Sequence, residues 1–336
     1  MSEKPPVLLV YAEGLNRQLV TDAHRARLAG LCRVLEPEPV PNFDDPRALP
    51  HLDTVEILLT GWGCPPLDEA ALDRVPNLRG AFHAAGTVKN HVKPACFDRG
   101  VRITSAAYAN AIPVAEFTVA AIVMANKKGF RAQRLYREVK GFRLWSKEYP
   151  EIGNHGKTVG IVGASRIGRM VIDRLQAFDV DLLVYDPYLD AAEARGLGAE
   201  PCELDDLLGR SDVVSLHAPS LPATRHMIDR RRLGLMNDGA VLVNTARGAL
   251  VDHEALTDEL VSGRIEAVID TTEPELLPAD SPLYDLDNVF LTPHIAGSQG
   301  TETRRMLDLA LDEIERFVRG EPLQHEVRRE DWDRVA

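Results

Sequence analysis

Three reactive side chains each follow a short apolar run in the second half of the sequence. Arg247 follows AVLVNTA, Glu275 comes soon after AVID, and His294 follows NVFLTP. A guanidinium is a permanently charged fork that suits carboxylates, an imidazole exchanges protons near neutral pH, and a carboxylate accepts an imidazole N–H. Ligands of open parallel sheets bind beyond the carboxyl ends of the strands, where such residues can converge. Singly, the three could equally be a paired surface arginine, a solvated carboxylate and a histidine beside a turn.

The elements that would carry these residues are short strands alternating with helical or turn segments, a pattern typical of parallel sheets with crossover helices. A long helical pattern from Pro113 to about Tyr136 separates two series of strands, and a second helical pattern follows Pro293. The predicted strands are residues 7–12, 55–61, 79–84 and 101–106 in the first series, and 158–163, 181–186, 212–219, 240–246, 267–270 and 288–293 in the second. We therefore predict an α/β fold with two doubly wound parallel sheets.

The domain organisation follows from length and order. A chain of 336 residues exceeds what one hydrophobic core usually organises, so two domains are expected. The last helical pattern is too short for a domain of its own and is expected to pack on the first domain. We predict a discontinuous domain, residues 1–108 with 299–336, and a domain inserted into it, residues 109–298.

A strand, a glycine turn and an amphipathic helix occur in order in TVGIVGASRIGRMVIDRL. Gly163 and Gly168 would permit a tight turn and close helix packing, and the helix N-terminus offers N–H groups to a pyrophosphate. Ser165 stands where such loops usually carry a middle glycine, and its hydroxyl could donate to phosphate. Asp186 ends the next strand, where a carboxylate can accept hydrogen bonds from an adenosine ribose and disfavours a 2′-phosphate. The alternative is an ordinary glycine turn, with Asp186 only capping a strand end.

Composition excludes other classes of function. The net charge of −12, from 39 basic and 51 acidic side chains, disfavours nucleic acid and anionic membrane surfaces as partners. The longest nearly apolar stretch, 112–125, is short for a membrane span and contains Glu116, and MSEKPP is no signal peptide. The four cysteines stand far apart without metal-ligand spacing, so we expect no metal site and a cytoplasmic protein.

Several motifs in order give the chain a resemblance to a known family over nearly its whole length. VGASRIGR, LHAPSLPATRHMI, NTARGALVD, DTTEPELLPADSPLYDLDNVFLTPHIAGS and RFVRGEPL all occur. The sequence resembles the NAD-dependent D-2-hydroxyacid dehydrogenases, which include phosphoglycerate, glyoxylate/hydroxypyruvate and D-lactate dehydrogenases. The resemblance implies two Rossmann-like domains, an NAD-binding domain inserted into a substrate-binding domain, and hydride transfer between NAD(H) and a small D-2-hydroxy acid or 2-keto acid.

The resemblance also assigns catalytic roles. Arg247 would hold the substrate carboxylate and polarise the keto oxygen, and His294 would give that oxygen a proton as hydride arrives. Glu275 would accept the other imidazole N–H. It is chosen over Glu273 because it lies five residues after Asp270, as in the family.

The cofactor contacts that the resemblance implies lie at strand ends and in the glycine turn. They are Gly163, Ser165, Arg166, Ile167, Gly168, Asp186, Ala218, Pro219, Thr245, Ala246, Arg247, Asp270, His294 and Gly297. The cofactor is expected to be NAD rather than NADP. In HAAGTVKN, the backbone N–H groups of Ala85, Gly86 and Thr87 would grip the substrate carboxylate together with Arg247, although a plain β-turn is the alternative. Lys89 departs from the family, which usually has an acid there.

Two further expectations concern partners. The helix from about Phe117 to Tyr136, with the segment through Trp145, resembles the family's dimer surface and predicts a homodimer, although its apolar stripe could equally be internal packing. The competing interpretation is a dinucleotide-sensing scaffold that resembles the C-terminal binding protein corepressors, which Ser165 and the unusual first-domain loop favour and the complete Arg, Glu and His set disfavours. A formate dehydrogenase is disfavoured because that branch usually has glutamine at the position of Glu275.

Overall fold

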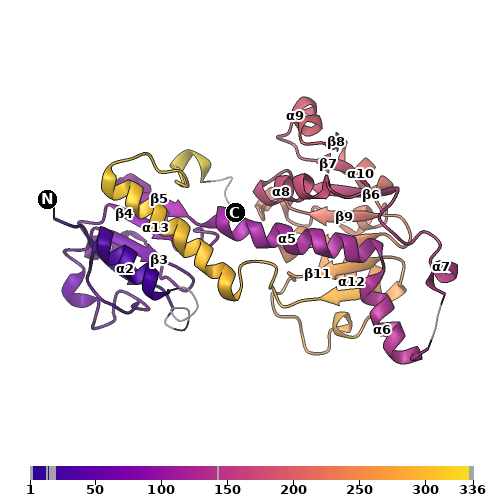
Figure 1. Ribbon diagram of the computed structural model, residues 1–336, viewed down its shortest axis with the longest axis horizontal. Coiled ribbons are helices and arrows are strands. Elements are labelled where there is room, and N and C mark those ends of the chain that lie inside the picture. The colour runs from indigo at the N-terminus through magenta and orange to yellow at the C-terminus, as the bar shows by residue number, and fades with distance from the viewer. Residues whose placement is uncertain (1–2, 13, 15–19, 142–143, 333–336) are drawn as a thin grey trace. The chain divides into compact units, whose positions relative to one another are not determined.

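Two compact units make up the chain in a computed structural model, which describes all residues except 1–2, 13, 15–19, 142–143 and 333–336. Unit 1 comprises residues 1–111 and 298–336, and unit 2 comprises residues 112–297. Each unit contains one parallel sheet with helices on its faces, of five strands in unit 1 and seven in unit 2 (Figure 1). The α/β prediction with two parallel sheets is confirmed.

The unit 1 sheet has the order β2-β1-β3-β4-β5, and the strands β1, β3 and β4 are fully buried. Its strands are β1 (Pro6–Val10), β2 (Arg33–Val34), β3 (Ile57–Thr60), β4 (Gly80–His83) and β5 (Arg102–Ser105). Helices α2 (Asp22–Leu31) and α13 (Thr303–Arg319) lie side by side on one face (Figure 1). Helices α3 (Glu69–Arg74) and α4 (Pro94–Asp98) contribute Leu72 and Cys96 to a separate hydrophobic core, which does not include residues of α2 or α13. The apolar stripe predicted after Pro293 is the buried face of α13, formed by Met306, Leu307, Leu309, Ala310 and Ile314.

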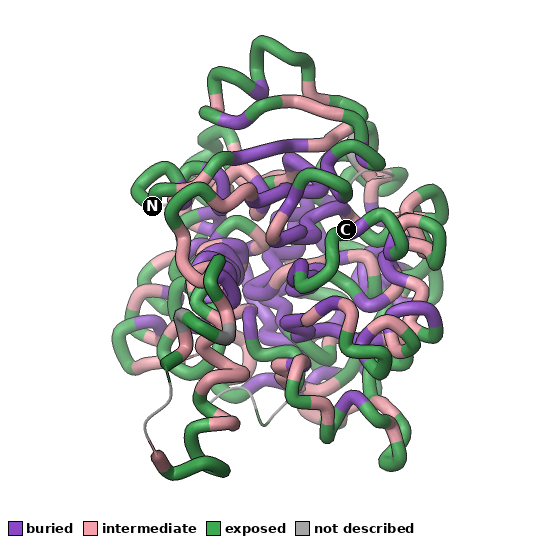
Figure 2. Tube along the Cα trace, turned by 90° about the vertical axis from the view of Figure 1, so that its right-hand side faces the viewer, coloured by how far each residue is buried: buried purple, intermediate pink, exposed green. Residues whose placement is uncertain are grey.

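The unit 2 sheet has the order β12-β11-β10-β9-β6-β7-β8. Its strands are β6 (Lys157–Val162), β7 (Val180–Tyr185), β8 (Glu200–Pro201), β9 (Val213–Leu216), β10 (Val241–Asn244), β11 (Glu266–Ile269) and β12 (Val289–Leu291). Its helices are α6 (Gly129–Val139), α7 (Trp145–Glu148), α8 (Arg166–Leu175), α9 (Ala191–Gly196), α10 (Leu204–Arg210), α11 (Arg230–Leu233) and α12 (His253–Ser262), together with most of α5 (Ala107–Asn126). Strands β9 and β10 are buried along their whole length, and Figure 2 shows buried residues gathered in the interior and exposed residues on the outside.

The helix predicted over 113 to about 136 was wrong in its bounds, because the structure has two helices there. Helix α5 begins at Ala107, so that Pro113 lies inside it, and α6 begins at Gly129 after Lys128 takes a left-handed φ of 48°. Proline cannot donate to the carbonyl one turn back, which usually ends a helix. Packing overrides that cost here, because Ala109 is buried with Met306 in unit 1 and Ala115 is buried in the core of unit 2.

The apolar stretch 112–125 was expected to be short for a membrane span, but it lies in α5, whose 20 residues have the length and hydropathy of a membrane-spanning segment. Half of its most apolar window is buried inside the structure. Val119 and Ile122 pack with Val159 and Ile161 of β6 in one core cluster. Its hydropathy is therefore that of a core helix.

Candidate active site

Glu275 and His294 meet at the carboxyl edge of the unit 2 sheet. Strands β10, β11 and β12 are neighbours, and Asn244, Ile269 and Leu291 lie in register as the last residue of each. Glu275 and His294 follow β11 and β12, and the Glu275 Oε1 atom lies 2.5 Å from the His294 Nδ1 atom. Both side chains are open to solvent, with exposed fractions of 64% and 44%. The contact leaves Nε2 as the ring nitrogen that can face a substrate.

Buried Asp270 builds the turn that presents His294. Its carboxylate accepts hydrogen bonds from the Thr292 hydroxyl at 2.6 Å and from the Ile295 and Ala296 N–H groups at 2.8 and 2.9 Å. The His294 N–H donates to the Asp270 carbonyl at 2.9 Å, and His294 takes a left-handed φ of 55°. A left-handed backbone costs a non-glycine residue about 1–2 kcal/mol, so the surrounding hydrogen bonds must hold it. Asp270 is 2% exposed, and this turn gives its buried charge polar partners.

Glu275 is carried on a short turn that is held from two sides. The Thr272 hydroxyl lies 2.8 Å from the Pro274 carbonyl and 3.0 Å from the Glu275 carbonyl, to which it donates. On the other side, a Cβ at Gly248 would lie 2.1 Å from the Thr272 carbonyl carbon. The two backbones therefore touch at a point where only glycine fits.

Arg247 follows β10 and lies close enough to Glu275 for their charges to interact. Desolvation lowers the pKa of Arg247, and the negative charge of Glu275 opposes that shift. The Arg247 Nη1 atom donates to the Ala246 carbonyl at 2.6 Å. The Asn244 amide donates to the Arg247 carbonyl at 2.9 Å, and Asn244 Oδ1 accepts from the Ala246 N–H at 3.1 Å. The sequence analysis missed Asn244, although an asparagine at a strand end is a recognised turn signal. The Thr245 hydroxyl bonds to Thr118 of α5 at 2.7 Å.

The glycine turn between β6 and α8 fits a pyrophosphate. Gly163 has a φ of 98°, and a Cβ at Gly168 would lie 2.1 Å from the Gly163 carbonyl oxygen, so both positions require glycine. The Ser165 hydroxyl accepts from the Gly168 N–H at 3.4 Å and thereby caps α8. Within the described residues, the backbone N–H groups of Ser165 and Ile167 donate to no acceptor. Such unsatisfied N–H groups at a helix N-terminus bind phosphate oxygens.

Asp186 follows β7 and is tied to the glycine turn. Its two carboxylate oxygens accept from the Ala164 N–H at 2.7 Å and the Tyr188 N–H at 2.9 Å. Each carboxylate oxygen has a second lone pair, so ribose hydroxyls could still bind. The remaining residues predicted for the cofactor lie in the segments that follow β9, β10 and β12 or in the first turn of α8, and comprise Arg166, Ile167, Ala218, Pro219, Thr245, Ala246 and Gly297.

In unit 1, the residues predicted to bind the substrate carboxylate form a loop directly after β4. Within the described chain, the N–H groups of Ala85, Gly86 and Thr87 donate to no acceptor, while the Ser105 hydroxyl donates to the Gly86 carbonyl. The loop therefore offers three successive donors, as an anion-binding segment does. Lys89, which departs from the family pattern, donates to the Trp332 carbonyl and lies over the Trp332 ring at 4.5 Å.

His83, at the end of β4, has a structural environment. Its Nδ1 atom lies 3.0 Å from the Thr60 hydroxyl, and its ring lies against that of His91 with centroids 4.2 Å apart. Burial holds the pKa of His83 well below its usual range, with the charge of His91 acting in the same direction. His83 is therefore neutral near pH 7.

We expect Gly168→Ala to weaken both the fold of unit 2 and NADH binding. The added methyl group collides with the Gly163 carbonyl, and overpacking of this kind costs about 1–3 kcal/mol. Urea unfolding and NADH titration measure the two effects. Gly196→Ala in α9 is the matched control, because nothing lies within 4 Å of its Cβ position. Equal behaviour of the two variants would contradict a steric requirement at Gly168.

The chain is similar to known proteins over most of its length. Residues 119–296, more than half of the chain, match the family described as D-isomer specific 2-hydroxyacid dehydrogenase, NAD binding domain. The chain is 31% identical over 305 residues to D-3-phosphoglycerate dehydrogenase of Methanocaldococcus jannaschii, covering 90% of this chain and 57% of that relative. It is 36% identical over 261 residues to glyoxylate reductase of Thermofilum pendens, covering 76% of each. The chain spans about half the length of the D-3-phosphoglycerate dehydrogenases that it matches.

Solved structures share the fold of both units. The TT0316 protein of Thermus thermophilus aligns with a TM-score of 0.77 and 28% identity, over 96% of this chain and all of that one (100%). The D-lactate dehydrogenase of Aquifex aeolicus, solved with NAD and lactic acid, aligns with a TM-score of 0.72 and 25% identity, over 94% and 96% of the two chains. With the glycine turn and the strand-end residues in place, the chain belongs to the D-isomer specific 2-hydroxyacid dehydrogenase family.

Proposed function

We propose that this protein is an NAD-dependent oxidoreductase that interconverts a small D-2-hydroxy acid and the corresponding 2-keto acid. The observation that carries the proposal is the 2.5 Å contact of His294 with Glu275, beside Arg247, on the sheet that also holds the glycine turn. A phosphate-binding turn alone would suit any dinucleotide-binding protein. The acid–base pair next to a cation adds the means to bind a carboxylate and move a proton.

The side chains divide the work by their chemistry. Arg247 binds the substrate carboxylate and draws electron density from the keto oxygen. Glu275 accepts the Nδ1–H of His294 and so fixes the ring, which leaves Nε2–H to protonate the keto oxygen. When bound, the nicotinamide supplies the hydride. In the oxidative direction His294 takes the proton from the hydroxyl.

A panel of small 2-keto acids tested with NADH and with NADPH examines the proposal directly. We expect NADH oxidation with at least one acid, at a rate well above that of a His294 variant. Binding of NADH without turnover of any panel member would instead favour the dinucleotide-sensing scaffold.

We propose NAD rather than NADP as the cofactor because of Asp186. A 2′-phosphate would lie against a carboxylate that already faces the glycine turn, and opposed like charges cost several kcal/mol. We expect Asp186→Ser to lower the NADH over NADPH preference in kcat/KM by about 10-fold or more. Asp181→Ser, an exposed position on β7, the strand that Asp186 follows, is the control. A wild-type enzyme that uses both cofactors equally would contradict the assignment.

The unit 1 loop and the cellular location belong to the same proposal. The N–H groups of Ala85, Gly86 and Thr87 would grip the substrate carboxylate. The four cysteines are free thiols, which suits a cytoplasmic location.

We also propose a homodimer formed through the segment from Phe117 to Trp145. Large apolar side chains stand exposed along it, namely Met124, Tyr136, Val139 and Leu144. An apolar surface of this kind is typical of an interface between subunits. Light scattering is expected to give the mass of two chains, and the mass of one chain would contradict the proposal.

A further inference from the structure

We propose that Glu273 is a positioning residue, which holds the turn of residues 272–275 so that the Glu275 carboxylate stays on His294 Nδ1. The inference rests on the proposed function and deepens it. Glu273 touches neither His294 nor the expected substrate contacts. It acts through the backbone that it shares with Glu275.

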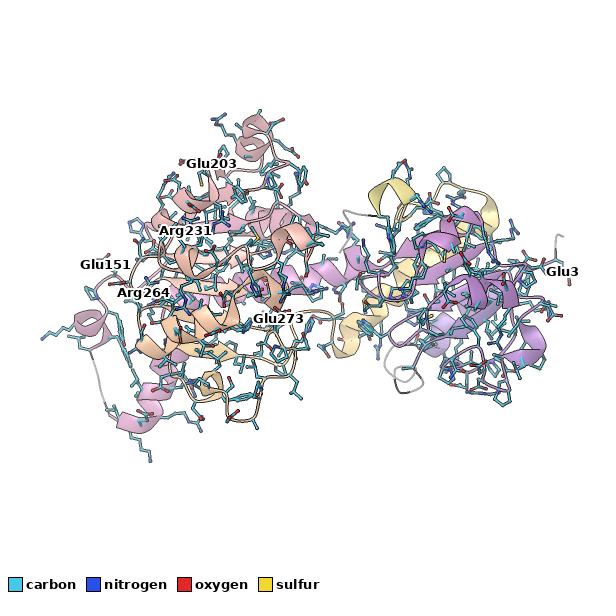
Figure 3. The ribbon with its side chains drawn as sticks, turned by 180° about the vertical axis from the view of Figure 1, so that it is seen from behind. Glu3, Glu151, Glu203, Arg231, Arg264 and Glu273 are labelled. Carbon is cyan, nitrogen blue, oxygen red and sulfur yellow. The ribbon has the colours of Figure 1, made fainter. Side chains whose placement is uncertain are left out.

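The side chain of Glu273 is held at both carboxylate oxygens. Arg225 Nη1 donates to Oε1 at 2.7 Å, and His226 Nε2 lies 3.3 Å from Oε2. Figure 3 labels Glu273, which lies in the loop after β11. Hydrogen bonding from Arg225 holds the pKa of Glu273 below its usual value, so the carboxylate is charged. Two neighbouring residues, Arg225 and His226, thus hold the side chain of Glu273, which lies two residues before Glu275.

The backbone of Glu273 is held as well. Its N–H donates to His253 Nε2 at 3.3 Å, at the first residue of α12. For Nε2 to accept, the ring must be neutral and carry its proton on Nδ1. Burial lowers the pKa of His253, which favours that neutral form. The amide and the carboxylate of one residue are therefore anchored to two different elements.

Backbone strain concentrates at the same place. Among the described residues, four other than glycine have a left-handed φ, and two of them are His226 at 49° and His294 at 55°. The His226 N–H donates to the Ala249 carbonyl at 2.8 Å, next to Gly248, whose backbone packs against Thr272. Strained residues persist where the surroundings determine them, and they cluster at functional sites. Here His226 contacts Glu273 and His294 contacts Glu275, and both glutamates belong to the same turn.

A role in global stability does not account for the cluster. The side chains of Arg225 and Glu273 are 54% and 36% exposed, and ion pairs this accessible contribute little to folding. A role in positioning, in contrast, depends on geometry at a turn. Small displacements of a catalytic group are costly to the rate.

The decisive experiment compares Glu273→Ala in two backgrounds, the wild-type chain and Glu275→Gln. In the wild-type chain we expect kcat to fall about 10- to 100-fold with KM for the keto acid and Kd for NADH unchanged. In the Glu275→Gln chain we expect no further loss, because the residue acts through Glu275. Glu273→Gln, which keeps an acceptor for Arg225, is expected to restore most of kcat. Asp258→Ala, which removes the exposed 2.7 Å pair with Arg230 in the same unit, is the matched control.

Two kinetic outcomes overturn the proposal: an unchanged kcat in Glu273→Ala, or an equal loss in both backgrounds. A second measurement does not depend on turnover. In a crystal structure of Glu273→Ala, the Glu275 Oε1 atom is expected to lie beyond hydrogen-bond distance of the His294 Nδ1 atom, from which it is 2.5 Å away in the wild-type chain. An unchanged contact also overturns the proposal. If the wild-type protein reduces no acid in the panel, the proposed function fails, and the crystal structure alone decides the role of Glu273.

Discussion

Replacement of His294 with Asn is expected to lower kcat for reduction of a 2-keto acid by about 10²- to 10⁴-fold, the usual contribution of a positioned proton donor. The amide cannot carry the proton that the keto oxygen needs, while it keeps a polar group in the turn built by Asp270. The Kd for NADH should stay within about twofold, because the pyrophosphate cradle lies at β6 and α8. Steady-state kinetics and fluorescence titration of NADH measure the two quantities.

The chain offers a close control for this variant. His155 is also an exposed histidine in unit 2, and its Nδ1 atom lies 2.5 Å from Asp179, the same separation as in the His294 pair. His155→Asn should therefore remove a similar ion pair without touching the site, and leave kcat unchanged. Comparable losses in the two variants would mean that His294 has no special role in proton transfer.

Substitution of Arg247 by Lys is the second large effect that we expect. The variant keeps a positive charge but loses the planar pair of donors that matches a carboxylate and its neighbouring keto oxygen. Removal of one such donor from the transition state costs about 10²- to 10³-fold, and we expect that loss in kcat/KM with the keto acid. Stopped-flow or steady-state rates against substrate concentration measure it.

Arg230→Lys supplies the comparison, because Arg230 is an exposed arginine of unit 2 whose pair, Asp258, lies outside the site. We expect kcat/KM to be unchanged there. An Arg247→Lys enzyme with wild-type kcat/KM would show that charge alone, and no fork geometry, is needed at this position.

The two sheets, and the position of the predicted site residues after their strands, could be predicted from the sequence because both depend on local pattern. Buried parallel strands appear as short apolar runs, and residues that directly follow such runs must lie at the same edge of the sheet. Asp270 illustrates the reasoning, since a carboxylate that ends an apolar strand needs polar partners, and it has three.

Features that depend on distant packing could not be predicted in this way. A proline usually marks the start of a helix, but Pro113 lies inside α5 because Ala109 is buried with Met306, almost two hundred positions later in the chain. The two-residue strands β2 and β8 carry too few residues for any periodicity. They form because they extend an edge that longer strands have already built.

The contacts around Glu273 were hidden for the same reason. Nothing local distinguishes Glu273 from Glu275 except spacing from Asp270. Arg225 and His226 lie in a loop that follows β9. The left-handed φ of His226 could not be predicted, because the usual sequence signal for such a φ is a glycine. Only the folded chain shows the contacts of Arg225 and His226 with Glu273, on which the proposed positioning role rests.

The order of strands has a consequence for how activity is lost. His294 follows β12, which has three residues and, among the described strands, lies at the sheet edge with β11 as its one partner. Edge segments open locally at a lower free energy than the central strands. Fraying of this single strand separates the ring from its carboxylate while the six other strands stay paired. Inactivation by mild denaturant is therefore expected to precede the loss of secondary structure.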